Sequence, residues 1–192
     1  TNIISGPEDG STVDTSMVTF TWEIEDGSEY SYSLNNANWS NWSSDEYTAT
    51  FDYLDEGSYL FIVKSRYNPL IEEEEPQEIS FTVNALQGPG LRVYPLLSKV
   101  NFYSTTHFSI YAEEVSGLVL AEFQISFDPD IVDISYYTKG NMFGDASSSA
   151  FVVEQTYGLL QVNFSTLGNT GLMGSGEILD VSFFGKQSDS KN

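Results

Sequence analysis

Residue types able to perform catalysis are scarce in this sequence. His107 is the only histidine, and there is no cysteine. A histidine activates a serine only when the serine and an orienting carboxylate lie beside it. His107 belongs to no such motif, and the Gly-x-Ser-x-Gly pattern is absent. Paired carboxylates for glycoside hydrolysis depend on their separation in space, and with 28 acids in 192 residues accidental pairs are expected. We therefore expect no enzymatic activity and a structural or surface role for His107.

Aspartates are frequent in the segment that begins at Asp128. Asp128, Asp130 and Asp133 could supply hard oxygen ligands for calcium, with Asn141 and Asp145 as further candidates. The alternative is that Asp-Pro-Asp ends a strand by turn chemistry without a metal ion. Because the ligand spacing of an EF-hand is absent, the turn is favoured. We expect no cofactor, with this calcium ion as the alternative.

Trp39 and Trp42, in Asn38-Trp39-Ser40-Asn41-Trp42-Ser43, are the strongest indication of carbohydrate binding. Exposed indole faces can stack on sugar rings, although tryptophan is usually buried. We expect the two rings to pack at a strand edge against the core of their own module. Polysaccharide binding through Trp39 and Trp42 is the alternative.

The charge balance excludes two classes of partner. The chain has 28 Asp plus Glu against 7 Lys plus Arg, which gives a net charge of −21. Nucleic acids and anionic membrane surfaces both require basic clusters, so neither is expected as a partner. The acidic run Glu72 to Glu75 is expected to be a solvated loop that discourages edge pairing.

The composition also indicates where the protein works. No apolar run approaches the ~20 residues of a membrane helix, so membrane insertion is not expected. The pattern of a signal peptide is absent at Thr1. The acidic, aromatic and lysine-poor composition is typical of an exported protein, either extracellular or at the cell surface.

Alternating apolar and polar residues predict β-strands throughout the chain. Val18, Phe20, Trp22 and Ile24 alternate with polar residues, as in a strand with one buried face. The same alternation predicts strands near residues 30–34, 47–51, 59–63, 79–83, 108–111, 121–127, 131–137, 151–155, 160–164 and 178–184. Turn residues separate the strands, and the first half has no stripe of helical period. This pattern is typical of antiparallel sandwiches.

Gln87-Gly88-Pro89-Gly90 is the best candidate for a linker, because two glycines and a proline interrupt the strand pattern. The sequence therefore predicts an all-β chain of two tandem antiparallel β-sandwiches. The expected limits are residues 1–84 for the first module, 85–90 for the linker and 91–192 for the second module.

The first module resembles the immunoglobulin-like and fibronectin type III-like modules of bacterial surface proteins. Gly6-Pro7-Glu8-Asp9-Gly10-Ser11 resembles their opening turn, and Phe20-Thr21-Trp22 their core-tryptophan strand. Leu54-Asp55-Glu56-Gly57-Ser58-Tyr59 resembles the corner before the penultimate strand. The resemblance implies that the hydroxyl group of Tyr59 bonds back to the upstream backbone, as in a tyrosine corner.

The second module resembles a cohesin domain, the jelly-roll sandwich that receives dockerin modules in cellulosomes and related surface assemblies. The resemblance lies in the run from Leu118 to Val132 with its Phe-Asp-Pro turn, in Gly140, and in the run from Gly174 to Phe183. It implies a dockerin-like or other surface protein as the partner. The first module would then be a spacer.

The chain departs from the cohesin pattern at its end. In that family two more strands follow the one matched by Ile178 to Phe184, and only residues 185–192 remain here. One of those strands normally belongs to the sheet that faces dockerin. Three explanations stay open: a chain cut short, a reduced relative, or a neighbouring protein that completes the module by strand addition. Residues 187–192 are expected to form a polar, frayed end.

Strand geometry and the resemblance together predict a binding surface. If Ala121, Phe123, Ile125 and Phe127 point into the core, their neighbours in the strand must point outward. The candidate contact residues are Leu120, Glu122, Gln124 and Ser126, with Gln161 and Asn163 expected to share their face. By resemblance, Leu120 and Glu122 occupy positions of polar dockerin contacts, and Leu120 indicates a more apolar interface. The alternative is an ordinary solvated sheet face.

The leading hypothesis is thus a non-catalytic scaffold or adhesion module pair that docks a partner protein. A carbohydrate-binding protein is the second hypothesis, and an accessory region of an enzyme is the third.

Overall fold

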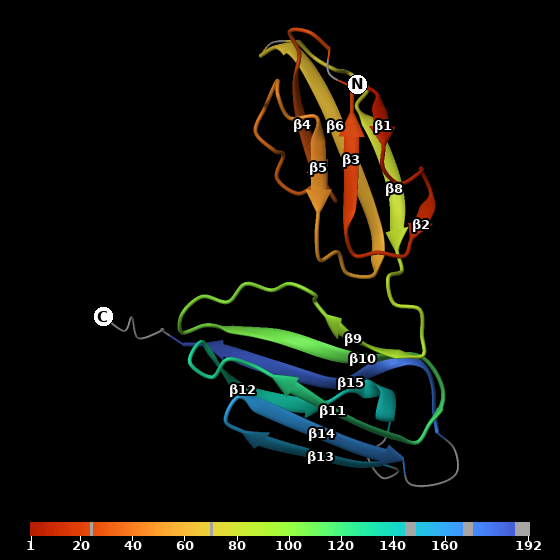
Figure 1. Ribbon diagram of the computed structural model, residues 1–192, viewed down its shortest axis with the longest axis vertical. Coiled ribbons are helices and arrows are strands. Elements are labelled where there is room, and N and C mark those ends of the chain that lie inside the picture. Colours follow the sequence, from red (N-terminus) through yellow and green to blue (C-terminus); the bar gives the residue numbers. More distant parts are fainter. Residues whose placement is uncertain (24, 70, 145–148, 167–170, 187–192) are drawn as a thin grey trace. The chain divides into compact units, whose positions relative to one another are not determined.

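The computed structural model describes residues 1–192 except positions 24, 70, 145–148, 167–170 and 187–192. The expectations for Ile24, Asp145 and the end at 187–192 therefore lie outside the described residues. The chain forms two compact units, Thr1–Leu86 and Gln87–Asn192. Both are built from antiparallel strands with one short parallel pair (Figure 1), so the predicted all-β class is confirmed. Within the described residues, no helix is long and apolar enough to cross a membrane.

The first unit contains two sheets. The three-stranded sheet has the order β1 (Ile3–Ser5), β3 (Val18–Trp22), β5 (Thr48–Phe51). The other sheet has the order β2 (Ser11–Val13), β8 (Gln77–Val83), β6 (Gly57–Asn68), β4 (Glu29–Leu34), and β7 (Ile71–Glu72) also pairs with β6. β1 and β2 belong to different sheets, so the chain changes sheet at the glycine-rich opening segment. A backbone hydrogen bond from Ser11 to Glu8, 3.0 Å long, closes the predicted turn there.

Aromatic rings from both sheets form the core of the first unit. Phe20 on β3 stacks on Phe61 of β6, with ring centroids 3.9 Å apart. Trp22 is 1% exposed and contacts the rings of Tyr30 and Tyr32 on β4. The predicted core-tryptophan strand is therefore confirmed.

The corner that enters β6 also has the expected hydrogen bond. The hydroxyl group of Tyr59 donates to the backbone carbonyl of Asp55 at 2.8 Å. This bond ties the start of β6 to the loop before it, as the tyrosine-corner resemblance implies.

The second unit is a sandwich of a four-stranded and a three-stranded sheet. The four-stranded order is β12 (Val132–Lys139), β15 (Leu172–Gly185), β10 (Thr105–Leu118), β9 (Gly90–Tyr94). The three-stranded order is β11 (Leu120–Ser126), β14 (Leu159–Thr166), β13 (Ser149–Thr156). A short 3-10 helix, η1 (Asn141–Phe143), follows β12.

Four strands, β1, β2, β7 and β9, were not expected from the sequence. β9 begins at Gly90, inside the segment assigned to the linker, and pairs with β10 from Gly90↔Glu113 to Tyr94↔Ser109. Prolines and glycine around this segment hide its strand pattern, because they are turn residues in local sequence. Its pairing with β10 is a long-range contact that local alternation does not reveal.

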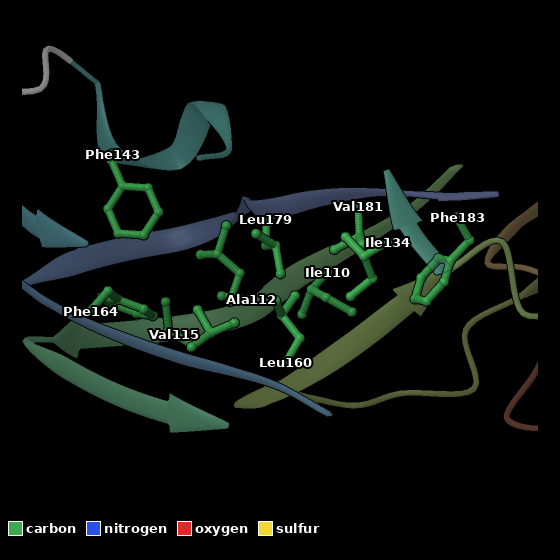
Figure 2. Close-up of a cluster of buried hydrophobic side chains, with 12 residues drawn as sticks. Ile110, Ala112, Val115, Ile134, Phe143, Leu160, Phe164, Leu179, Val181 and Phe183 are labelled. Carbon is green, nitrogen blue, oxygen red and sulfur yellow. The ribbon is translucent and has the colours of Figure 1, made fainter. Parts of the chain in front are cut away.

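The core of the second unit lies between its two sheets (Figure 2). Leu160 and Val162 of β14 and Leu179 and Val181 of β15 are completely buried, because these strands lie inside their sheets. Phe143 of η1 packs edge-on against Phe164, with centroids 4.9 Å apart.

Candidate functional site

β11 presents the predicted alternation. Ala121, Phe123 and Ile125 pack against the core. Leu120, Glu122, Gln124 and Ser126 are exposed on the opposite face of the strand. The predicted orientation of β11 is therefore confirmed, because successive side chains of a strand point to opposite faces.

β14 brings the other predicted residues to the same face. Asn163 pairs with Glu122, and Gln161 pairs with Gln124. Directly paired residues of antiparallel strands share a face, and a hydrogen bond of 2.9 Å from Nε2 of Gln161 to Oε1 of Glu122 runs between the two strands on this face. The structure thus brings all six predicted contact residues together.

β13 adds residues that were not singled out from the sequence. Val152 pairs with Asn163, and Glu154 pairs with Gln161, so both side chains join the same face. The alternation of residues 151–155 predicted the strand, but its register against β14 is a long-range property.

We define the docking face as the outward side chains of the three-stranded sheet. Its members are Leu120, Glu122, Gln124, Ser126, Ala150, Val152, Glu154, Thr156, Leu159, Gln161, Asn163 and Ser165. Both strand pairings run without a register shift. Leu120 is 65% exposed and Val152 is 50% exposed. The charged members are Glu122 and Glu154, so the face combines four apolar side chains, amide groups and negative charge.

The aspartates proposed as calcium ligands do not come together. Oδ1 of Asp128 accepts the backbone N–H of Asp130 at 2.9 Å, as in a turn. Oδ2 of Asp133 forms an ion pair of 3.2 Å with Lys186. No group of three His, Cys, Asp or Glu residues in the described part of the chain could hold a metal ion. The calcium prediction for Asp128, Asp130 and Asp133 therefore gains no support from the described residues, and the favoured turn accounts for Asp128.

Asp130 has a different partner. Its Oδ1 accepts a hydrogen bond of 3.1 Å from the hydroxyl group of Tyr157. This bond, and the negative charge of Asp130, raise the pKa of the Tyr157 phenol.

His107 lies on the outer face of the four-stranded sheet. Its Nδ1 is 3.3 Å from Oδ1 of Asp180, and the hydroxyl group of Ser109 donates to Oδ2 of the same carboxylate at 3.3 Å. A hydrolase needs the histidine between serine and acid. Here the acid lies between the two, so the serine hydroxyl is not activated by His107.

Trp39 and Trp42 lie outside the core, which corrects the expectation that they pack against it. Trp39 is 42% exposed, and neither ring belongs to the buried cluster of the first unit. Nζ of Lys64 lies 4.5 Å from the centroid of Trp39, and Cζ of Arg66 lies 4.3 Å from that of Trp42. Ser31 of β4 pairs with Lys64 of β6, and its hydroxyl group donates to the loop.

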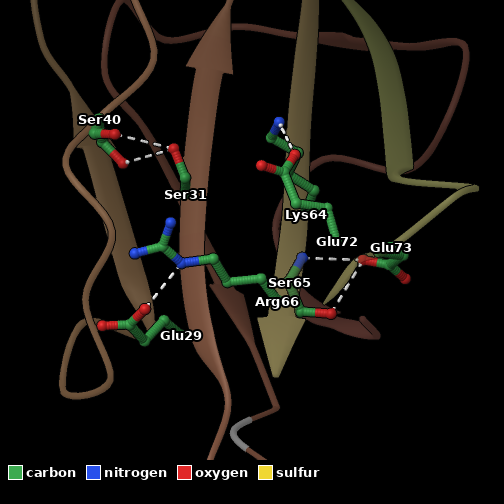
Figure 3. A network of polar contacts seen from close by, with 8 residues as sticks. All are labelled: Glu29, Ser31, Ser40, Lys64, Ser65, Arg66, Glu72 and Glu73. Carbon is green, nitrogen blue, oxygen red and sulfur yellow. Dashed lines mark hydrogen bonds and ion pairs between the residues drawn. The ribbon is translucent and has the colours of Figure 1, made fainter. Parts of the chain in front are cut away.

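The cations that cover these rings are themselves held by carboxylates. Arg66 forms an ion pair of 2.7 Å with Glu29, and Lys64 forms one of 2.7 Å with Glu72 (Figure 3). We call Trp39, Trp42, Lys64 and Arg66 the cation–π ladder. Because a cation lies over each indole ring, a sugar ring would have to compete for that face.

Loop residue Ser40 fixes the ladder to β4. Its backbone N–H donates to the carbonyl of Tyr32 at 2.9 Å, and its carbonyl accepts from the hydroxyl group of Ser31 at 2.8 Å. Figure 3 shows Ser40 facing Ser31. The loop thus continues the edge of the sheet beside β4.

The acidic run Glu72 to Glu75 is more than a solvated loop. Glu73 is partly buried, and its Oε2 accepts the backbone N–H of Ser65 at 2.9 Å (Figure 3). Burial acts to raise the pKa of Glu73, but hydrogen bonds from the N-terminal ammonium group, from Thr1 and from Ser65 outweigh it and lower the pKa.

Comparisons with known proteins give structural neighbours only. No family model and no curated protein matches the chain. A non-cellulosomal cohesin from the archaeon Archaeoglobus fulgidus is similar, with 15% identity and a TM-score of 0.38 over 44% of this chain. The chain spans just over half, 56%, of that cohesin chain.

Two solved structures align with almost the whole chain. The type II cohesin dyad from the ScaA scaffoldin of Acetivibrio cellulolyticus has 8% identity and a TM-score of 0.43, covering 96% of this chain and 84% of the dyad. The C-terminal domain of the AgI/II polypeptide BspA of Streptococcus agalactiae has 8% identity and a TM-score of 0.37, covering 97% and 90%. The structural neighbours thus include cohesin domains and a surface-polypeptide domain.

Proposed function

We propose that the second unit is a non-catalytic protein-docking module whose binding surface is the docking face. The observation that carries this proposal is the strict alternation of β11, which packs the partly buried Phe123 and Ile125 against the core and leaves Leu120 65% exposed. A large apolar side chain on a regular sheet face costs solvation free energy unless a partner covers it. It is therefore a candidate for the central contact of an interface.

The chemistry of the face defines the partner. Glu122 and Glu154 favour a partner with basic groups. The amides of Gln161 and Asn163 favour hydrogen-bonding groups, and Leu120 favours an apolar contact. The sequence resemblance to cohesins supports a dockerin-like module, which would lay a helical surface across the three strands. The first unit would act as a spacer in an exported scaffold or adhesion protein, extracellular or at the cell surface.

Charge reversal at Glu122 tests this placement. A panel of recombinant type I and type II dockerin modules is titrated against residues 1–192, and affinities are measured by isothermal calorimetry. We expect one module to bind, and Glu122→Arg to weaken it at least about tenfold, because reversal places like charges at the contact.

Glu78→Arg is the matched control, since it reverses an exposed strand carboxylate of the first unit. It should leave the affinity unchanged. An affinity that survives Glu122→Arg, or a panel in which no module binds, would contradict the proposal.

A further inference from the structure

Within the described residues, the sandwich of the second unit is open along one side. β9 is the last strand of the four-stranded sheet, and β11 is the last strand of the three-stranded sheet. A groove of about 300 Å³ lies where they approach each other, lined by Val93 of β9, Ile125 of β11, and Phe108 and Phe183 from the strands between. The lining is almost entirely apolar. We call it the edge groove.

Burial confirms that the core reaches the surface here. Leu91 and Val93 on β9 pair with Ala112 and Ile110, which are core residues 0% and 5% exposed. Leu91 and Val93 therefore also face inward, yet each is 43% exposed. Core-facing aliphatic side chains remain this exposed only where a covering element is absent.

The opposite side of the sandwich is covered at η1. There Phe143 is 4% exposed and contacts Phe151 of β13, while Lys139 of β12 lies over its ring. A cavity of about 450 Å³ also lies on that side, but Asp133 and Lys186 line it, so it is more polar than the edge groove.

β11 lacks the devices that usually protect a sheet edge. Natural edge strands carry lysines, prolines or bulges that prevent pairing with another chain. β11 has seven residues in unbroken register with β14, no proline, and Glu122 as its single charge. By contrast β12, the other end of the four-stranded sheet, has a register shift between Ile134 and Tyr136.

We propose that the edge groove accepts an extended segment of a partner protein, which adds as a strand beside β11. The segment supplies main-chain hydrogen bonds to the free edge of β11 and inserts apolar side chains, at every second position, between Val93 and Ile125. It spans about the seven residues of β11 and carries neutral or basic polar residues between the apolar ones.

The charge of the chain favours a partner protein over a second copy of this chain as the occupant of the edge groove. Two copies each carry a net charge of −21 over the whole chain, and repulsion between two such chains opposes their association. A neutral or basic segment meets no such barrier. The edge groove shares Gln124 with the docking face, but its occupant pairs with the free edge of β11 and does not lie on the outer face. This proposal therefore does not rest on the proposed function.

A synthetic peptide tests the proposal on residues 1–192. The probe is fluorescein-labelled Lys-Thr-Val-Thr-Ile-Thr-Val-Thr-Lys, and the control peptide has the same composition with its three apolar residues consecutive. Fluorescence anisotropy should show at least tenfold tighter binding of the alternating peptide. Hydrogen exchange at Leu120–Ser126 should slow when it binds, because the added strand pairs with the β11 amides.

Variants locate the contact. Val93→Asp places a charge in the groove and should weaken the peptide at least tenfold, whereas Ile131→Asp, at a 54% exposed aliphatic residue outside the groove, should not. Equal binding of both peptides, or unchanged exchange in β11, would overturn the proposal. A concentration-dependent dimer that Val93→Asp abolishes would overturn it too, because a second copy would then be the occupant.

Discussion

At the scale of single residues, the cation–π ladder is the set of contacts that most clearly holds a loop of the first unit in place. Lys64 and Arg66 are the only Lys or Arg residues in positions 1–86. Both lie over the tryptophans of one loop. Most Asp and Glu residues of the chain belong to the same unit. The two cations of this acidic unit therefore hold the loop of Trp39 and Trp42 against β4 and β6.

Removing the charge of Arg66 should loosen this loop. Arg66→Gln is expected to lower the free energy of unfolding by about 1 kcal/mol, the usual size of an exposed cation–π contact. Chemical denaturation monitored by tryptophan fluorescence measures it. Glu29→Gln keeps the stacking and removes only an exposed ion pair, which contributes little. An equal loss in both variants would show that the ion pair, not the ring contact, stabilises the loop.

Tyr157 provides a second test at this scale. Its phenol donates to Asp130, so the pKa is raised, and Asp130→Asn should lower it towards the ordinary value for tyrosine. Ultraviolet difference titration, with Tyr157→Phe to identify the signal, measures the change. Asp133→Asn, whose carboxylate pairs with Lys186, should leave the Tyr157 signal in place. A Tyr157 titration that is the same in the Asp130→Asn variant would contradict the assignment.

At the scale of elements, the alternation of apolar and polar residues predicted the features that depend on a single strand. The inward and outward faces of β11 follow from a period of two residues, and Leu120, Glu122 and Gln124 lie where that period places them. The tyrosine corner was implied by the resemblance to immunoglobulin-like modules and not by alternation, and its partners Tyr59 and Asp55 are close in sequence.

Features that depend on contacts between distant segments of the chain could not be predicted from the local pattern. The register that brings Val152 onto the docking face is set by pairing with β14. Trp39 was expected to pack at a strand edge against the core, because its sequence does not reveal that Lys64 lies opposite. A calcium site at Asp128 and Asp133 was the alternative to a turn, and a backbone N–H and Lys186 engage the two carboxylates separately.

One close approach between elements gives a test of the second unit. A Cβ atom at Gly140, between β12 and η1, would overlap the backbone carbonyl of Glu177 on β15. Gly140→Ala should therefore destabilise the unit by about 1–3 kcal/mol, the usual cost of forcing extra volume into a packed site. Gly144→Ala is the matched control for space, because a Cβ there meets nothing within 4 Å.

Thermal and denaturant unfolding of both variants measure the difference. Gly144 has a φ of +55°, so Gly144→Ala carries a backbone cost without a steric contact, whereas Gly140→Ala carries the steric contact. Equal stability of Gly140→Ala and the unchanged chain would contradict the packing of Gly140 against β15.

At the scale of the whole molecule, the chain contains two hydrophobic cores, and neither buried cluster contains residues of the other unit. We therefore propose that residues 1–86 and 87–192 each fold alone. Each piece should show one cooperative unfolding transition with the stability that it has in the full chain, measured by circular dichroism during denaturation. A piece that stays unfolded would show that the units depend on each other.

The central claim is that the docking face binds a partner protein through Leu120. The most direct test is the affinity of the Leu120→Ala variant for the dockerin module that binds the unchanged chain, measured by calorimetry. We predict a loss of at least about tenfold, whereas Met173→Ala, at a 68% exposed residue on β15, should bind normally. An affinity of Leu120→Ala equal to that of the unchanged chain would contradict the account.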